Sequence, residues 1–342
     1  MPQTLHRCEL RVDVTGSVRL PGKIEIAATA FLPDPSSLSD LPIAMFAFPG
    51  GGYSRGYYDL QCEGHNGYSQ AEFHVARGAV FVALDHLGVG ESTLTCLDSM
   101  YIEDIAKAND AAVREIMRRL EAGALAPGYP AMRALFKVGI GQSMGAGLTM
   151  IMQGRHRTYD AIAPLGYSAI HTVMPQRTEA DVLKGLQGHG RNATRETDPR
   201  SLSMLRSIRS TVDFIYPFHW EDVPKDILDA DMDGGFPVRK RMPRWGSATI
   251  PNCVVGMMAP GFVAKDVAEI DIPVLLAMGE RDVVPAPLNE PAAFKKSTDV
   301  SVFVIPRMAH MHNFASTRQL LWQRLDDWSN MIARHSFNRP MV

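Results

Sequence analysis

The sequence has few of the features that mark secreted, membrane-embedded or zinc-stabilised proteins. Its four cysteines stand far apart in 342 residues and form no Cys-x-x-Cys or Cys/His pattern, which argues against a disulfide framework and a structural metal site. No run approaches the ~20 consecutive apolar residues of a transmembrane helix. The first residues also lack the apolar segment of a secretory signal. We therefore expect a cytoplasmic protein with no membrane partner.

An excess of charge of one sign is also missing. There are 35 basic and 37 acidic side chains, a formal net charge of −2, so the chain has no electrostatic footprint for nucleic acid. The hydrophobic share of 46% and the charged share of 21% are typical of a globular protein and exclude a disordered chain. No metal-ligand cluster and no Gly-x-Gly-x-x-Gly opening a helix is present, so we expect neither a metal nor an organic cofactor. The oligomeric state is left open.

Short apolar runs alternate with amphipathic segments over most of the chain. The expected strands lie at residues 9–15, 23–32, 43–48, 79–84, 136–140, 161–165, 272–278 and 300–305. The expected helices lie at residues 67–77, 101–120 and 317–334, with another that starts near 145. This alternation predicts an α/β protein with a doubly wound, mainly parallel sheet.

The alternation stops in the middle of the chain. Residues 167–263 contain helical stretches, proline-rich turns and many aromatic residues, but no clear strand run. The length of the chain allows a core domain that carries a sizeable insertion. We therefore predict a core domain of residues 1–166 and 264–342. A largely helical cap, or lid, of residues 167–263 is expected before the strand at 272–278.

The sequence contains two Gly-x-Ser-x-Gly motifs. The motif at residues 141–145 places Ser143 directly after a predicted strand and directly before a helix of small residues. A nucleophilic serine needs such a sharp turn, and glycines two positions away on either side relieve the crowding there. The motif at residues 52–56 places Ser54 in a loop several residues beyond its strand. This context favours Ser143 as the nucleophile.

Carboxylate and histidine side chains follow two later predicted strands. Glu280 and Asp282 come after the strand at 272–278, and His310 and His312 come after the last strand. A serine nucleophile needs a base to take its proton and an acid to orient that base. Because the carboxyl ends of parallel strands meet at one edge of a sheet, we expect these groups near Ser143.

The order Ser, Asp, His and the segments that carry it resemble the α/β-hydrolase superfamily, in particular its serine esterases and lipases. The resemblance implies the α/β-hydrolase fold. It assigns the acid to Asp282, which ends a Gly-x-x-Asp segment, rather than to Glu280. It assigns the base to His310, with His312 as the competitor.

A glycine-rich loop follows the strand at 43–48. Acyl transfer produces an oxyanion that backbone N–H groups must stabilise. One donor is expected from Met144, the residue after the nucleophile, and the other from Gly51 or Gly52. The loop resembles the His-Gly-Gly-Gly loop of esterases, with Pro49 in the position of the histidine.

The predicted cap and the glycine-rich loop carry aromatic side chains that are candidates for substrate contact. We expect some of these aromatic residues to form an apolar wall over the nucleophile. Most aromatic residues of a cap, however, form the core of the cap itself. The candidates are Tyr53, Phe218, Trp220 and Trp245. The basic residues 239–241, together with Arg244, are able to hold a substrate carboxylate or phosphate, but such runs are usually solvated faces.

These observations predict a serine hydrolase that cleaves a carboxylic ester of a medium-sized, partly hydrophobic small molecule through an acyl-enzyme. The same three groups also serve a carbon–carbon bond hydrolase, a lactonase, a thioesterase or an acyltransferase. A non-catalytic ligand-binding protein on the same scaffold is the alternative of another class.

Overall fold

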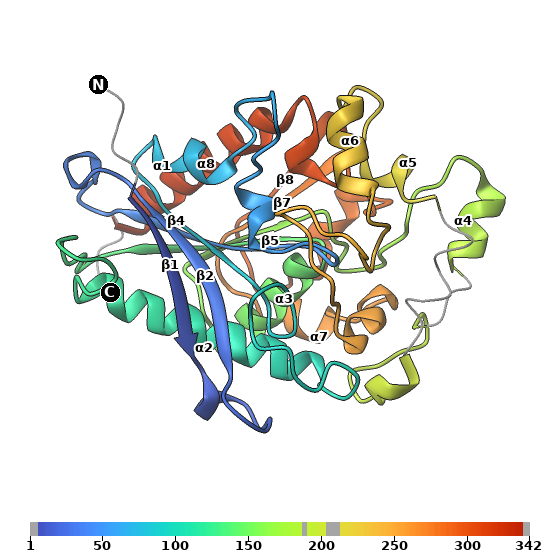
Figure 1. Ribbon diagram of the computed structural model, residues 1–342, viewed down its shortest axis with the longest axis horizontal. Helices are drawn as coiled ribbons and strands as arrows, with labels where there is room; N and C mark the ends of the chain where they lie inside the picture. The colour runs from blue at the N-terminus through green and yellow to red at the C-terminus, as the bar shows by residue number, and fades with distance from the viewer. Residues whose placement is uncertain (1–5, 187–189, 203–212, 338–342) are drawn as a thin grey trace.

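An eight-stranded sheet runs through the centre of the molecule (Figure 1). The computed structural model describes residues 6–186, 190–202 and 213–337. The strand order is β1-β2-β4-β3-β5-β6-β7-β8, and all pairs from β4 to β8 are parallel. The strands are β1 (His6–Asp13), β2 (Glu25–Leu32), β3 (Ile43–Phe48), β4 (Val80–Leu84), β5 (Phe136–Gln142), β6 (Ala161–Leu165), β7 (Val274–Arg281) and β8 (Val300–Ala309). This topology confirms the predicted doubly wound, mainly parallel sheet.

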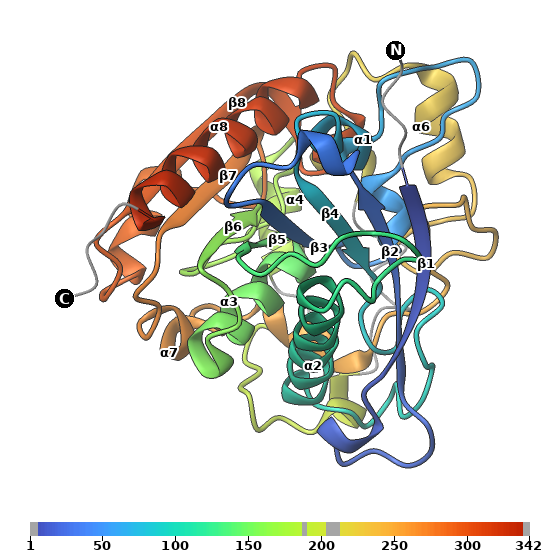
Figure 2. The same ribbon diagram turned by 90° about the vertical axis from the view of Figure 1, so that its left-hand side faces the viewer.

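Helices cover both faces of the sheet (Figures 1 and 2). Contacts place α1 and α8 on one face and α2, α3 and α7 on the other. Their bounds are α1 (Gln70–Val75), α2 (Ile102–Glu121), α3 (Met144–His156), α7 (Ala264–Val267) and α8 (Arg318–Phe337). In β3 the alternation of side chains sends Phe46 and Phe48 into one hydrophobic cluster and Met45 and Ala47 into the other. Both faces are therefore buried, which explains why the strands read as continuous apolar runs.

The last two strands are longer than the apolar pattern predicts. β7 extends to Arg281 and β8 to Ala309, and these two residues are paired across a register shift. The extensions include Glu280, Arg281 and Arg307, which are exposed or partly exposed and therefore interrupt the apolar runs. Hydrophobicity alone therefore underestimates how far these strands reach toward the site.

Residues 167–263, here called the insertion, lie between β6 and β7 in the chain. In the part of the insertion that the structure describes there is no sheet strand, only short helices joined by irregular segments. The helices are α4 (Glu179–Leu186), η4 (Pro199–Leu202), α5 (Ile215–Phe218), α6 (Lys225–Met232) and η6 (Asn252–Met258). Helices α4, α5 and α6 gather on the side of the molecule away from β1 (Figure 1). No helix among the described residues is long and apolar enough to cross a membrane.

Candidate active site

Ser143 occupies a tight turn between β5 and α3. Its backbone has φ +54° and ψ −116°, a region that residues other than glycine rarely adopt. A Cβ atom at Gly141 would overlap the carbonyl oxygen of Gly145, and one at Gly145 would overlap the carbonyl oxygen of Phe48. The two glycines are therefore required by backbone packing, which is the physical reason for the Gly-x-Ser-x-Gly pattern here.

The structure brings Ser143, His310 and Asp282 together in one hydrogen-bonded chain. Each is the first residue after a parallel strand, namely β5, β8 and β7. His310 Nε2 lies 2.9 Å from Ser143 Oγ, and His310 Nδ1 lies 2.6 Å from Asp282 Oδ1. His310 and Asp282 are both buried. This geometry allows His310 to take the serine proton while Asp282 fixes the tautomer of the imidazole.

The Asp282 carboxylate takes part in four hydrogen bonds. Oδ1 accepts from His310 at 2.6 Å and from the Val283 N–H at 2.7 Å, and Oδ2 accepts from His312 at 2.7 Å and from the Gly279 N–H at 2.8 Å. Burial alone raises the pKa of this carboxyl group. The attraction of the two histidines and their hydrogen bonds outweigh burial and hold the pKa well below its usual range.

The lowered pKa of Asp282 predicts a loss of stability in acid. Because the pKa is lower in the folded than in the unfolded state, its contribution is complete above the unfolded value of about 3.9 and is lost as the pH falls further. We expect the free energy of urea unfolding to fall more steeply in the wild type than in Asp282→Asn as the pH falls from about 5 to 3. Parallel pH profiles for the two proteins would contradict this assignment.

Two side chains beside the hydrogen-bonded chain make contacts that the sequence did not predict. His312, expected as a competitor for the base, does not contact Ser143 and bonds the second oxygen of Asp282. Gln142 donates from Nε2 to the carbonyl oxygen of His310 at 2.8 Å and so holds the histidine loop against β5. The only sequence signal for the contact between His312 and Asp282 was the spacing of two histidines at i and i+2. Nothing in the sequence indicated the contact between Gln142 and His310.

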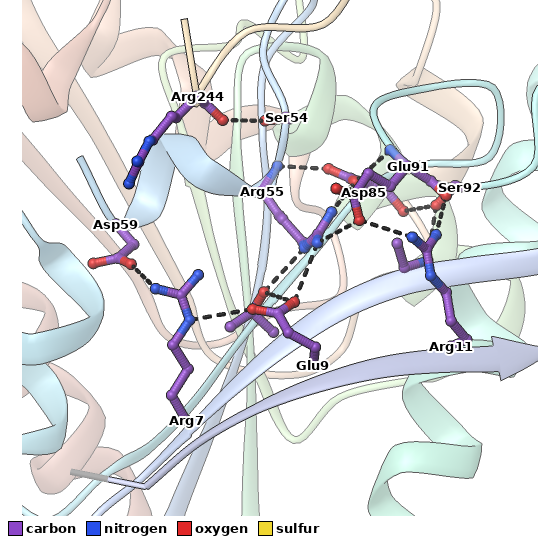
Figure 3. A network of polar contacts seen from close by, with 12 residues as sticks. Arg7, Glu9, Arg11, Ser54, Arg55, Asp59, Asp85, Glu91, Ser92 and Arg244 are labelled. Atoms are coloured by element: carbon purple, nitrogen blue, oxygen red, sulfur yellow. Dashed lines mark hydrogen bonds and ion pairs between the residues drawn. The ribbon is translucent and has the colours of Figure 1, made fainter. Parts of the chain in front are cut away.

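Ser54, the alternative nucleophile, lies outside this arrangement. Its hydroxyl donates to the carbonyl oxygen of Arg244 at 3.3 Å, and it has no histidine partner among the described residues. It sits beside a network of ion pairs, where the guanidinium of Arg55 contacts Asp85 at 2.6 Å and Glu91 at 2.8 Å (Figure 3). This network holds the turn after β4 and has no connection to Ser143 in the described contacts.

An apolar cavity of about 220 Å³ opens beside Ser143 and His310. Gly51 and Met144 line it, and in the described part of the chain neither backbone N–H donates a hydrogen bond. Two of the three residues expected to supply oxyanion donors therefore line the same cavity as Ser143. Gly52, the third, does not line the cavity. Its carbonyl oxygen instead accepts from the Ser247 N–H at 3.0 Å.

Only one of the four aromatic residues expected at the substrate lines this cavity. Phe218 does so, and its ring centroid lies 5.2 Å from that of His310. Tyr53 and Trp245 are instead buried and donate hydrogen bonds to Asp231, at 2.7 and 2.8 Å. Trp220 packs under the guanidinium of Arg281, 4.5 Å from its ring centroid. For Tyr53 and Trp245 the polar atoms explain the difference, because a buried phenol or indole must find a hydrogen-bond partner.

No protein-family model and no curated protein sequence matches the chain, but solved structures do. An esterase from Thermogutta terrifontis matches with a TM-score of 0.61 and 15% identity, over 95% of this chain and 99% of its own. A haloalkane dehalogenase variant from Bradyrhizobium elkanii matches with a TM-score of 0.59 and 14% identity, over 98% and 100%. A peroxisomal α/β-hydrolase from Saccharomyces cerevisiae matches with a TM-score of 0.55 and 12% identity, over 99% and 91%. The chain has the α/β-hydrolase fold.

The α/β-hydrolase fold does not by itself choose the reaction, since the similar structures include both an esterase and a dehalogenase. The chemistry must come from the site of this chain. Among the described residues, no group of three or more His, Cys, Asp or Glu side chains is placed to hold a metal ion. The cavity lining includes the side chains of Ser143 and His310 and the backbone of Gly51 and Met144.

A buried charge cluster joins the insertion to the α/β-hydrolase core. Asp231 is fully buried and contacts Arg239 at 2.9 Å and His219 at 2.9 Å, in addition to Tyr53 and Trp245. The expectation that residues 239–241 form a solvated face is wrong for Arg239, because its side chain is buried on Asp231. Arg239 Nε also donates to the carbonyl oxygen of Gly52 at 3.2 Å, so the cluster anchors the glycine-rich loop beside the serine.

Proposed function

We propose that this protein is a serine hydrolase that cleaves a carboxylic ester, or a related acyl bond, of a medium-sized and partly hydrophobic small molecule. The observation that carries the proposal is the hydrogen-bonded chain from Asp282 through His310 to Ser143, which ends at an apolar cavity. A purely structural serine does not need a strained backbone and an ordered histidine pointing at its hydroxyl.

The geometry supports a two-step mechanism through an acyl-enzyme. Ser143 Oγ attacks the acyl carbon while His310 Nε2 accepts its proton, and Asp282 stabilises the resulting imidazolium. The N–H groups of Gly51 and Met144 stabilise the oxyanion. His310 then donates the proton to the leaving alcohol, so the ester bond breaks as the acyl-enzyme forms. In the second step His310 takes a proton from a water molecule as its oxygen attacks the acyl carbon. The bond between the acyl carbon and Ser143 Oγ then breaks, His310 returns the proton to Oγ, and the acid is released.

The insertion supplies much of the cavity wall, which supports its proposed role as a cap. The residues that it contributes are mainly apolar and include Met174, Phe214, Phe218, Phe236, Val255, Met257 and Met258. Main-chain hydrogen bonds of 2.9 Å run from the N–H groups of His310 and Met311 to the carbonyl oxygens of Pro217 and Phe218. A change in the position of α5 would therefore move His310 and Met311 as well as the cavity wall.

The test of this function is a panel of para-nitrophenyl esters with acyl groups of increasing length. We expect a rapid initial release of nitrophenol equal to the enzyme concentration, followed by slower turnover, because the acyl-enzyme accumulates. Acyl chains that fill the apolar cavity are expected to react faster than acetate esters. Folded protein that hydrolyses no ester would contradict the proposal, and a preference for short polar acyl groups would contradict the substrate class. Thioesters and lactones in the same panel separate the related acyl chemistries.

The hydrogen bond from His312 to Asp282 predicts a smaller, positioning role for this second histidine. His312→Ala removes one of four donors to the carboxylate, a charge-assisted bond, so we expect kcat/KM to fall about tenfold. His310→Ala is expected to lose about 10⁴-fold, because the base itself is gone. His312→Gln keeps an N–H donor and should recover part of the loss and of the wild-type pH profile. Equal losses in the two alanine variants would contradict the assignment of His310.

A further inference from the structure

Arg191 presents a positive charge to the wall of the cavity that contains Ser143. Its side chain is half-buried. Nη1 donates to the carbonyl oxygens of Thr172 at 3.0 Å and Met258 at 3.3 Å, and it also contacts His171 Nε2. All three acceptors are neutral. The contacts fix the guanidinium in place through one nitrogen, and Nε and Nη2 have no partner among the described residues.

No carboxylate of the described residues lies within ion-pair distance of Arg191. The four stretches outside the described residues contain no aspartate or glutamate, so they hold no acidic side chain that could serve. Burial lowers the pKa of Arg191, and no carboxylate opposes that effect. By contrast the buried guanidinium of Arg239, in the same insertion, is paired with Asp231 at 2.9 Å. A partly desolvated cation without a partner is costly, and substrate cavities are where such a charge is useful.

A second polar group on the same cavity wall also lacks a partner. Thr172 is 4% exposed, and its hydroxyl oxygen Oγ1 makes no hydrogen bond within the described part of the chain. Buried hydroxyl groups are nearly always hydrogen-bonded in native structures. Arg191 is bonded to the carbonyl of this same threonine, so the guanidinium and the hydroxyl belong to one region of the wall.

We propose that Arg191 and Thr172 form an anion subsite and that the substrate is an ester with a carboxylate remote from the scissile bond. The inference rests on the proposed ester hydrolysis for the other half of the substrate. Guanidinium nitrogens with free N–H groups and a hydroxyl donor suit the two oxygens of a carboxylate. One positive charge matches a carboxylate better than a phosphate monoester, which carries a charge near −2. The apolar wall between the subsite and Ser143 then receives the hydrocarbon spacer.

Two matched pairs of esters test the subsite from either side of the scissile bond. In the first pair the carboxylate is on the acyl group: the para-nitrophenyl monoester of adipic acid is compared with para-nitrophenyl hexanoate. In the second it is on the alcohol: para-carboxyphenyl hexanoate is compared with para-tolyl hexanoate. We expect the wild type to prefer the charged member of at least one pair. Arg191→Gln should reduce that ratio of kcat/KM about 10- to 100-fold, the range for a hydrogen bond to a charged group. Arg191→Lys should retain part of the preference.

Lys184 offers a matched control on the same cavity wall. Its ammonium group is already paired with Asp181 at 2.8 Å and its side chain is mostly exposed. Lys184→Gln should therefore keep the ratio of kcat/KM between the charged and the neutral ester of each pair. Thr172→Val should lower the ratio by a smaller factor, about fivefold, since it removes one neutral donor. A fluorophosphonate labelling rate and a near-ultraviolet circular dichroism spectrum show whether each variant has folded.

The outcomes separate this inference from the proposed function. Hydrolysis of the neutral esters at least as fast as the charged ones in both pairs, with a ratio that Arg191→Gln leaves unchanged, would overturn the anion subsite alone. If no ester is hydrolysed, the proposed function fails and the subsite is judged by calorimetric binding of hexanoate and hexanamide to the wild type. Tighter binding of hexanoate that Arg191→Gln weakens about tenfold or more would support the subsite. Equal binding would overturn it.

Discussion

Replacement of Ser143 by alanine is expected to lower kcat/KM for any ester that the protein hydrolyses by at least about 10⁴-fold. The variant keeps the oxyanion donors and the cavity, so we expect a small residual rate above that of water for substrates that bind well. The loss is large because the serine and histidine act as one unit: His310, 2.9 Å from the hydroxyl, has no proton to accept once the oxygen is gone. Steady-state hydrolysis of the best ester in the panel measures the effect.

Ser54→Ala is the matched control for this variant. Ser54 stands at the centre of the second Gly-x-Ser-x-Gly motif, but its hydroxyl donates only to the carbonyl oxygen of Arg244. Loss of one weak hydrogen bond is expected to cost about 1 kcal/mol of stability and to leave hydrolysis near the wild-type rate. A large loss of activity in Ser54→Ala, with Ser143→Ala still active, would reverse the assignment of the nucleophile.

The second large effect is expected at the buried charge cluster. Asp231→Ala leaves the guanidinium of Arg239 buried without a carboxylate, and breaking a buried pair in this way costs about 3–5 kcal/mol. The variant also removes the acceptor of the Tyr53 hydroxyl, the His219 ring and the Trp245 indole. We expect a clear fall in the midpoint of urea unfolding. Activity should fall as well in the folded fraction, because Arg239 and Tyr53 anchor the glycine-rich loop.

Asp233→Asn and a double variant serve as controls for this prediction. Asp233 pairs with Arg241 at 2.7 Å, but both side chains are mostly exposed, so its loss should cost less than about 1 kcal/mol. The variant Asp231→Asn with Arg239→Met removes both charges and should be more stable than Asp231→Ala. Equal stability of Asp231→Ala and Asp233→Asn would show that the cluster does not hold the insertion to the core.

The sheet was predictable because its central strands are buried on both faces. β3 and β6 were predicted with their observed bounds, since no polar residue interrupts apolar runs such as residues 43–48. The candidates for nucleophile, acid and base were found near the ends of three other strands, β5, β7 and β8, and the resemblance then selected Asp282 and His310 among them. Local sequence patterns therefore predict the candidate site residues that stand at the ends of strands.

The remaining contacts depend on parts of the chain that are far apart in sequence. Arg239 stands in a basic run that is typical of a solvated face, and only the tertiary structure shows that Asp231 meets it inside the protein. Tyr53 was expected at the substrate because hydrophobic content does not reveal where a hydroxyl group finds its acceptor. The cavity role of Arg191 likewise depends on the carbonyl groups around it, which no residue pattern records.

Reaction with a fluorophosphonate probe, followed by peptide mapping of the adduct, tests directly whether Ser143 is an activated nucleophile. We expect one labelled serine, Ser143, with labelling retained in Ser54→Ala and in His312→Gln. Labelling should be slower by orders of magnitude in His310→Ala, because the probe reports the activation of the nucleophile by its base. Labelling at Ser54, or no labelling of correctly folded wild-type protein, would contradict the claim that Ser143, His310 and Asp282 form a working catalytic site.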